Sequence, residues 1–222
     1  MPFFARFLLL LLVFSIHLGV KAQARKESAI TRKYSPEALK EDVSVMEKVI
    51  LAMHPVMGIY KSRDYYRAYF DSVRSSFTDS LNERDFRLRL KLAIDELHCG
   101  HTEVLYSNRY YIESAKQKFN YSPYFFVPLQ DKVYLLTSLN KKKDTLIRRA
   151  NRIISINGIS ADSMLRYCKR FVTTDGYNTT GKDHFIKYGF NTYYLSIFGR
   201  PDTFTVEYIR KDTLRKITYP AV

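Results

Sequence analysis

The pattern of apolar residues changes at the stretch Asp95-Glu96-Leu97-His98-Cys99-Gly100-His101-Thr102-Glu103. Before it, apolar residues recur at helical spacing; after it come short runs rich in tyrosine, phenylalanine and valine. The stretch closes a helix, breaks at Gly100 and leaves His101 just after the break. Because an imidazole with an ordinary pKa near 6.5 exchanges protons at neutral pH, His101 is a candidate general base.

The same stretch also has a purely structural interpretation. Gly100 would end the helix in the left-handed conformation, as glycine commonly does. His98 would then interact with the negative end of the helix dipole, and His101 would lie in solvent. Spacing alone does not separate this interpretation from a catalytic one.

The N-terminal segment predicts export. Arg6 precedes an apolar run centred on Leu8–Leu12, and small residues around Ala22 and Ala24 follow. This order is typical of a secretory signal peptide over residues 1–24, with an uncleaved membrane anchor as the alternative. We therefore expect a periplasmic or extracellular protein, soluble after signal removal, in which residues 25–33 form a polar linker.

The net charge of +14 falls to +12 when Arg6 and Lys21 leave with the signal peptide. The remaining basic residues are scattered through expected turns and do not line one helix face, so we expect no nucleic-acid partner. A solvated basic surface, or attraction to anionic components of the envelope, would explain the excess of basic residues.

Residues 34–106 are expected to form a helical domain. Ser35 followed by Pro36 starts the first helix, which stops at His54 before a proline. A second helix starts at Ser62, and a third starts near Asn82 or Ser80 and leads to His101. The aromatic residues on the second helix are expected to pack into the core.

Residues 121–222 are expected to form a β-rich domain, which makes the fold class α+β. The expected elements are a hairpin around Gln130-Asp131, a strand 152–156 with an Asn157-Gly158 turn, a helix capped by Ser160, a helix near 180–188, and a closing hairpin from 203–208 and 216–219. The residues around 113–118 read as a polar connection.

The cysteines and histidines of the central stretch do not by themselves indicate a metal site. His98, Cys99 and His101 lack a second ligand cluster, and Gly100 breaks the helical geometry that would align them. Cys99 and His101 are also too close in sequence to favour a nucleophile–base pair. We expect no metal and no cofactor, and the pairing of Cys99 with Cys168 stays open.

Three motifs, in this order, resemble the tail-specific (carboxy-terminal processing) serine peptidases, in their tricorn-like branch. The first is the helix end 94–102, which is similar to the Asp-Gly-His-Thr signature of that family, with Cys99 in place of the acidic residue. The second is the strand and turn 151–160, and the third is the strand 204–208. The resemblance implies a helical layer followed by a PDZ-like domain, with His101 as the general base.

The resemblance also implies a substrate, a polypeptide with a free C-terminus bound by strand addition to the PDZ-like domain. The nucleophilic serine of this family lies in a peptidase core downstream of that domain, which is expected to be absent here. The first hypothesis is therefore the N-terminal part of an exported serine peptidase, inactive alone. The alternatives are a stand-alone envelope module that binds peptides and, from a third class, an exported structural protein; the oligomeric state stays open.

Overall fold

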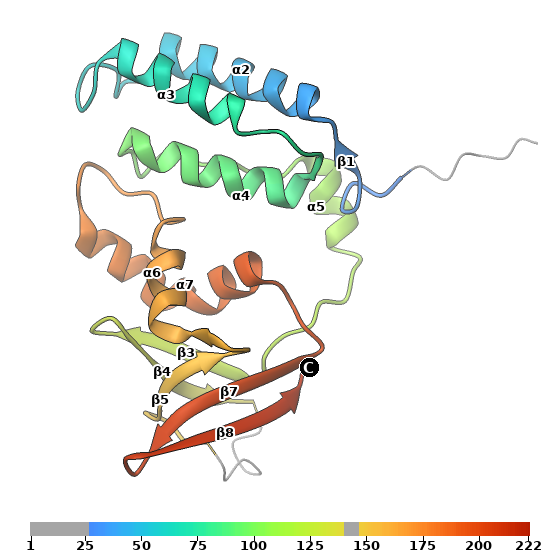
Figure 1. The fold of residues 1–222 in the computed structure, drawn as a ribbon, viewed down its shortest axis with the longest axis vertical. Helices are drawn as coiled ribbons and strands as arrows, with labels where there is room; N and C mark the ends of the chain where they lie inside the picture. The colour runs from blue at the N-terminus through green and yellow to red at the C-terminus, as the bar shows by residue number, and fades with distance from the viewer. Residues whose placement is uncertain (1–26, 140–146) are drawn as a thin grey trace, which may run out of the picture.

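The computed structural model describes residues 27–139 and 147–222, so the expected signal peptide lies outside the described residues. Figure 1 shows three tiers: helices α2, α3 and α4 at one end, an antiparallel sheet at the other, and α6 and α7 between them. The expected α+β fold class is confirmed.

The helices of the helical layer begin at the capping residues that the sequence predicts. Its helices are α2 (Pro36–Met53), α3 (Arg63–Ser75) and α4 (Glu83–Ile94), and the short strands β1 (Lys33–Tyr34) and β2 (Leu81–Asn82) pair beside them. The side chains of Ser35, Ser62 and Asn82 each accept a hydrogen bond from a backbone N–H of the first turn. All three predicted starts are confirmed, because a cap is a local interaction.

Residues 27–33, expected as a linker, are held against α5 (Asn108–Ser114), a helix that the sequence pattern does not predict and that ends in the expected polar connection. The Glu113 carboxylate accepts hydrogen bonds from Ser28 Oγ at 2.7 Å, the Ala29 N–H at 2.6 Å and Arg109 Nε at 2.8 Å. These donors, Ser28 first, lower the pKa of Glu113 to about 2. Glu113 therefore joins two segments that are distant in the sequence.

The sheet has the strand order β3-β4-β5-β7-β8, and β6 pairs with β5 beside this path. The strands are β3 (Tyr124–Leu129), β4 (Lys132–Ser138), β5 (Arg152–Ile156), β6 (Ile159–Ser160), β7 (Thr203–Arg210) and β8 (Thr213–Pro220). Every pairing is antiparallel. The tight turns at Gln130-Asp131, Asn157-Gly158 and Lys211-Asp212 have positive φ at both central residues, as two-residue hairpins require.

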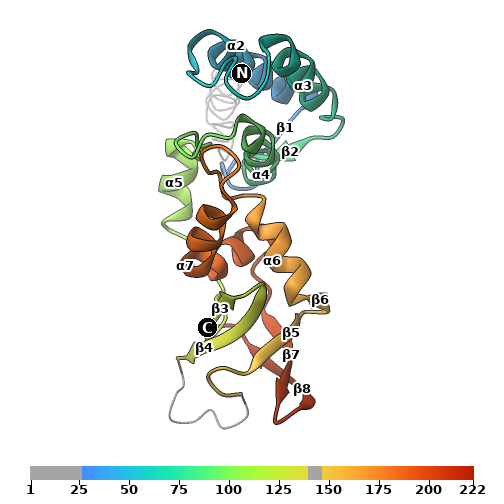
Figure 2. The ribbon, with the colours of Figure 1, turned by 90° about the vertical axis from the view of Figure 1, so that its left-hand side faces the viewer.

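Helices α6 (Ala161–Lys169) and α7 (Thr179–Phe198) pack on the sheet and form the main core with it. Ser160 caps α6 as expected. α7 is longer than the expected 180–188 segment. Phe190 is fully buried in the sheet core, and Arg84 and Lys91 of α4 contact Ser196 and Tyr193 near the end of α7. In Figure 1, α7 lies beneath α4. Figure 2 shows α6 beside α7, above the sheet.

Two polar contacts fix α4 against α7. Near the start of α4, Arg84 Nη2 donates to Ser196 O at 2.6 Å, which satisfies a carbonyl in the last turn of α7. Just beyond the end of α4, Asp95 Oδ1 lies 2.7 Å from Lys182 Nζ in the first turn of α7. Contacts at both ends set the two helices antiparallel, and with them the helical layer against the sheet.

The outer edge of β3 is closed to a further strand. The Phe126 N–H donates to Asn191 Oδ1 at 3.0 Å, and Asn191 Nδ2 donates to Phe126 O at 2.8 Å. The Tyr124 N–H donates to Ser122 Oγ at 3.1 Å, and Pro128 has no N–H. Residues 124, 126 and 128 share one side of the strand, so its outward donors are all used or absent.

Replacing Asn191 with alanine should open this edge. It removes both hydrogen bonds to Phe126 and should lower the free energy of unfolding by about 1–3 kcal/mol. The control is Thr192→Ala, which changes an exposed neighbour on the same helix. It should alter the free energy of unfolding by less than about 0.5 kcal/mol. Urea unfolding measures the difference, and amide hydrogen exchange at Phe126 should accelerate only in the Asn191 variant; equal protection in both would contradict the role given to Asn191.

Candidate functional site

The turn that carries His101 starts earlier than the sequence predicts. α4 ends at Ile94, a 3-10 turn spans Asp95–Leu97, and His98 adopts the left-handed conformation with φ 51°. The predicted left-handed cap at Gly100 is therefore wrong. The His98 ring lies 4.5 Å from the Tyr177 ring and 5.5 Å from the Tyr60 ring, and this packing holds a residue whose backbone is in an unfavourable region.

Two loops meet at this turn. The Gly100 N–H donates to Asp175 Oδ1 at 2.7 Å, and the Gly176 N–H donates to His98 O at 2.9 Å. A Cβ on Gly100 would lie 3.3 Å from Thr174 Cα, so a side chain there would push the loops apart. Gly100 is thus needed for the close approach of the second loop rather than for a positive φ.

His101 stands at the mouth of this junction. Its side chain is 87% exposed, and its Nδ1 lies 3.6 Å from Asp175 Oδ1. Within the described ranges, no serine hydroxyl is hydrogen-bonded to His101. Sequence reasoning found His101 but missed Asp175, because it lies in a loop with no motif and reaches the histidine only through the tertiary fold.

Cys99 completes a group of three metal-ligating side chains with His101 and Asp175. One donor atom from each lies within 4.8 Å of the others. The Thr102 N–H donates to Cys99 O at 3.3 Å, closing a turn that brings Cys99 and His101 together despite their short separation in sequence. Cys99 is half-buried at the edge of the helical core, whereas the other two are exposed.

Both cysteines are free thiols in the structure. Cys168 is fully buried in the sheet core, and burial raises its pKa to about 12. A thiol in that state is neither a nucleophile nor a ligand at neutral pH. Any thiol chemistry in the described residues therefore belongs to Cys99.

Two further contacts support the turn from the helical layer. Lys91 on α4 is 5% exposed, and its Nζ donates to Glu103 Oε1 at 3.0 Å, which fixes the chain just after His101. The His54 Nε2 lies 2.7 Å from Thr102 Oγ1. The predicted capping position of His54 is confirmed, since His54 follows the last residue of α2.

His54 should make stability depend on pH. Its Nδ1 accepts from the Val56 N–H at 3.2 Å, so the proton lies on Nε2, which donates to Thr102. Burial lowers the pKa of His54. Below the unfolded-state pKa of about 6.5 the unfolded chain binds a proton that the folded chain resists, so this contribution is present above that pH and lost as pH falls.

The measurement is the free energy of unfolding between about pH 7.5 and pH 5.5. It should fall more steeply with decreasing pH in the unmodified chain than in His54→Gln. His184→Gln removes an exposed histidine on α7 and should keep the original slope. A slope unchanged by His54→Gln would contradict the assignment.

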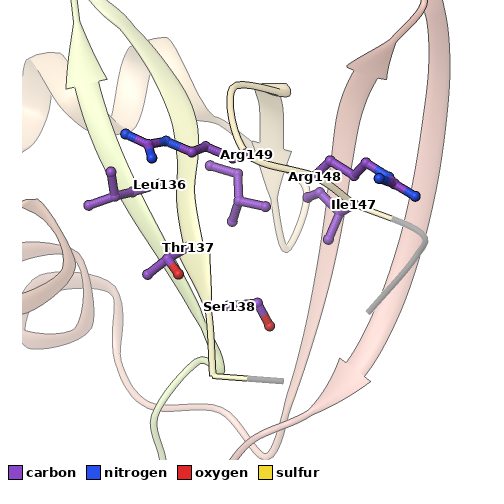
Figure 3. Close-up of a pocket in the computed structure, with 7 residues that line it drawn as sticks. Leu136, Thr137, Ser138, Ile147, Arg148 and Arg149 are labelled. Atoms are coloured by element: carbon purple, nitrogen blue, oxygen red, sulfur yellow. The ribbon is translucent and has the colours of Figure 1, made fainter. Parts of the chain in front are cut away.

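Two cavities lie on the sheet side of the molecule. One, of about 380 Å³, is a partly open pocket between the start of β3 and α7; it is mostly apolar, and Arg200 is among its lining residues. The Arg200 guanidinium stacks over the Tyr121 ring at 4.6 Å. The other, of about 650 Å³, is lined by residues of β4 and by 147–149; Figure 3 shows Arg148 and Arg149 pointing in opposite directions there.

Comparisons with known proteins bear on the fold. No protein-family model matches the chain, and no curated protein matches it. Two solved structures of CPAF, a chlamydial serine protease, are similar: mature CPAF (13% identity, TM-score 0.55) and a serine-to-alanine mutant of it (11% identity, TM-score 0.57). Each similarity covers 84% of this chain and 34% of the CPAF chain. The chain thus shares its fold with part of CPAF and spans about a third of the length of these neighbours.

Proposed function

We propose that this chain is the base-bearing part of an exported serine peptidase that acts on polypeptide C-termini. The observation that carries the proposal is the His101–Asp175 pair at the mouth of the junction, 3.6 Å apart and held on two loops joined by backbone hydrogen bonds. A carboxylate near Nδ1 stabilises, by its charge, the imidazolium that forms when the base takes a proton. The peptidase-related fold supports the same assignment.

The nucleophile in this proposal is a serine outside residues 27–139 and 147–222. A base without a nucleophile performs no acyl transfer, so the described part is expected to be inactive by itself. His101 Nε2 can face an incoming hydroxyl, because the ring contacts Asp175 through Nδ1. The substrate we propose is a polypeptide chain, as a peptidase-related fold implies.

A second candidate function is a stand-alone envelope module that binds peptides. It is favoured by the apolar cavity of about 380 Å³ with Arg200 in its lining, which suits an apolar C-terminal residue and its carboxylate. Because the donors of β3 are already used, a peptide there would be held by Arg200 and the apolar walls rather than by pairing with β3.

Export is part of both proposals and rests on the expected signal peptide. Among residues 27–139 and 147–222, no helix combines the length and the apolar character needed to cross a bilayer. The periplasmic or extracellular location and the absence of a nucleic-acid partner stay predictions from sequence.

The test starts from the native protein, captured from its own cells with an antibody to residues 34–100. The precipitate is assayed for hydrolysis of peptides with free or amidated C-termini, and for a serine labelled by a fluorophosphonate reagent. Hydrolysis with a labelled serine supports the peptidase, and a preference for the free C-terminus supports the substrate. Peptide binding without hydrolysis or labelling supports the binding module and overturns the peptidase.

A further inference from the structure

The spacing of His101 and Asp175 has an explanation other than a hydrogen bond. At 3.6 Å, the distance from His101 Nδ1 to Asp175 Oδ1 exceeds the range of a good N–H···O hydrogen bond. Two ligands of a tetrahedral zinc ion, each about 2.0–2.1 Å from the metal, lie about 3.3 Å apart. The pair is therefore within a few tenths of an ångström of ligand spacing, and the Cys99 sulfur is within 4.8 Å of both donor groups.

The backbone around these three residues is already arranged as a support. Asp175 Oδ1 accepts from the Gly100 N–H at 2.7 Å, the kind of outer contact that orients a ligating carboxylate. The Gly176 N–H to His98 O bond holds the second loop, and the Thr102 N–H to Cys99 O bond holds the first. Rotation of the side chains of His101, Asp175 and Cys99 would bring their donor atoms to ligand spacing. His101 and Asp175 are exposed, and Cys99 is half-buried.

We propose that Cys99, His101 and Asp175 bind one Zn²⁺ ion, with a fourth coordination position open to water or a ligand. A thiolate, an imidazole and a carboxylate form a donor set that zinc accepts, whereas Mg²⁺ and Ca²⁺ prefer oxygen ligands alone. Cys99 supplies the sulfur at the floor of the site, and the two exposed ligands leave its outer side accessible to solvent.

Zinc binding and general-base catalysis make mutually exclusive demands on one side chain. With Nδ1 ligating the metal, the neutral ring carries its proton on Nε2, so Nε2 has no lone pair to take a proton from a serine, and a ligating Asp175 no longer orients the ring. Zinc at this site would therefore block the base. The binding proposal itself does not rest on the peptidase assignment, because it is tested without any substrate.

The experiment is a titration of the full-length reduced chain with Zn²⁺ by calorimetry, and with Co²⁺ by absorption spectroscopy. We expect one ion per chain and a thiolate-to-Co²⁺ charge-transfer band. Cys99→Ser should abolish the band, and His101→Ala and Asp175→Asn should each weaken Zn²⁺ binding by at least about tenfold. Circular dichroism confirms that each variant is folded.

Two matched variants serve as controls. Cys168→Ala removes the buried thiol, and His184→Ala removes an exposed histidine outside the group of three; both should retain one ion and the charge-transfer band. A Zn²⁺ affinity unchanged in folded Cys99→Ser, or no binding to the unmodified chain, would overturn the proposal. Neither result bears on hydrolysis by the native protein, so the two proposals fail separately.

Discussion

Replacing His101 with alanine will lower peptide hydrolysis by the native protein by about 10²–10⁴-fold, the usual contribution of a general base. The loss should appear in kcat, with KM within about twofold, because the imidazole acts on the proton in the transition state and not on the bound peptide. Steady-state kinetics on the captured protein, in a strain carrying the substitution, makes the measurement.

The control for this substitution is His184→Ala, which removes an exposed histidine from α7 and should leave kcat unchanged. Asp175→Asn should lower kcat less than His101→Ala, because it removes the orienting charge and keeps the base. Metal chelation before the assay separates the loss of the base from an effect of bound zinc. Unchanged turnover in His101→Ala would remove the base assignment.

Phe190→Ala will have the largest effect on stability, lowering the free energy of unfolding by about 3–5 kcal/mol. The Phe190 side chain is 0% exposed, in the core between α7 and the sheet, and its ring stacks on Tyr194 at a centroid distance of 6.3 Å. Removing the ring leaves a cavity lined by the rigid strands of the sheet.

Phe185→Ala makes the same chemical change five residues earlier on the same helix. That side chain is 59% exposed, so the expected change is within about 0.5 kcal/mol. Urea unfolding of both variants compares a buried and an exposed phenylalanine. The substitution and its effect on helix propensity are the same in both. Similar losses in the two would mean that α7 presents a different face to the sheet.

The elements that the sequence predicts correctly are those specified locally. The caps at Ser35, Ser62 and Ser160 and the Asn157-Gly158 turn depend on residues within a few positions of each other, so the pattern is sufficient. α5 was missed because it is short and mostly polar, and its stability comes from contacts such as Glu113 with Ser28.

The candidate site was predictable only in part. His101 follows a recognisable helix end, but its left-handed neighbour is His98 because aromatic packing with Tyr60 and Tyr177 overrides the preference for glycine. Asp175 could not be found, since its contact with the central turn joins residues 75 positions apart. The same holds for Asn191 and the closed edge of β3.

The docking of α4 on α7 has a consequence for when the site is completed during synthesis of the chain. His101 and Asp175 lie far apart in the sequence, and the Arg84–Ser196 and Lys182–Asp95 contacts join the parts of the chain that carry them. A chain synthesised only as far as α4 and the turn after it would hold the histidine without its aspartate. Completion of folding would thus act as the checkpoint that assembles the site, and a half-folded intermediate would have neither a reactive base nor a place for a metal.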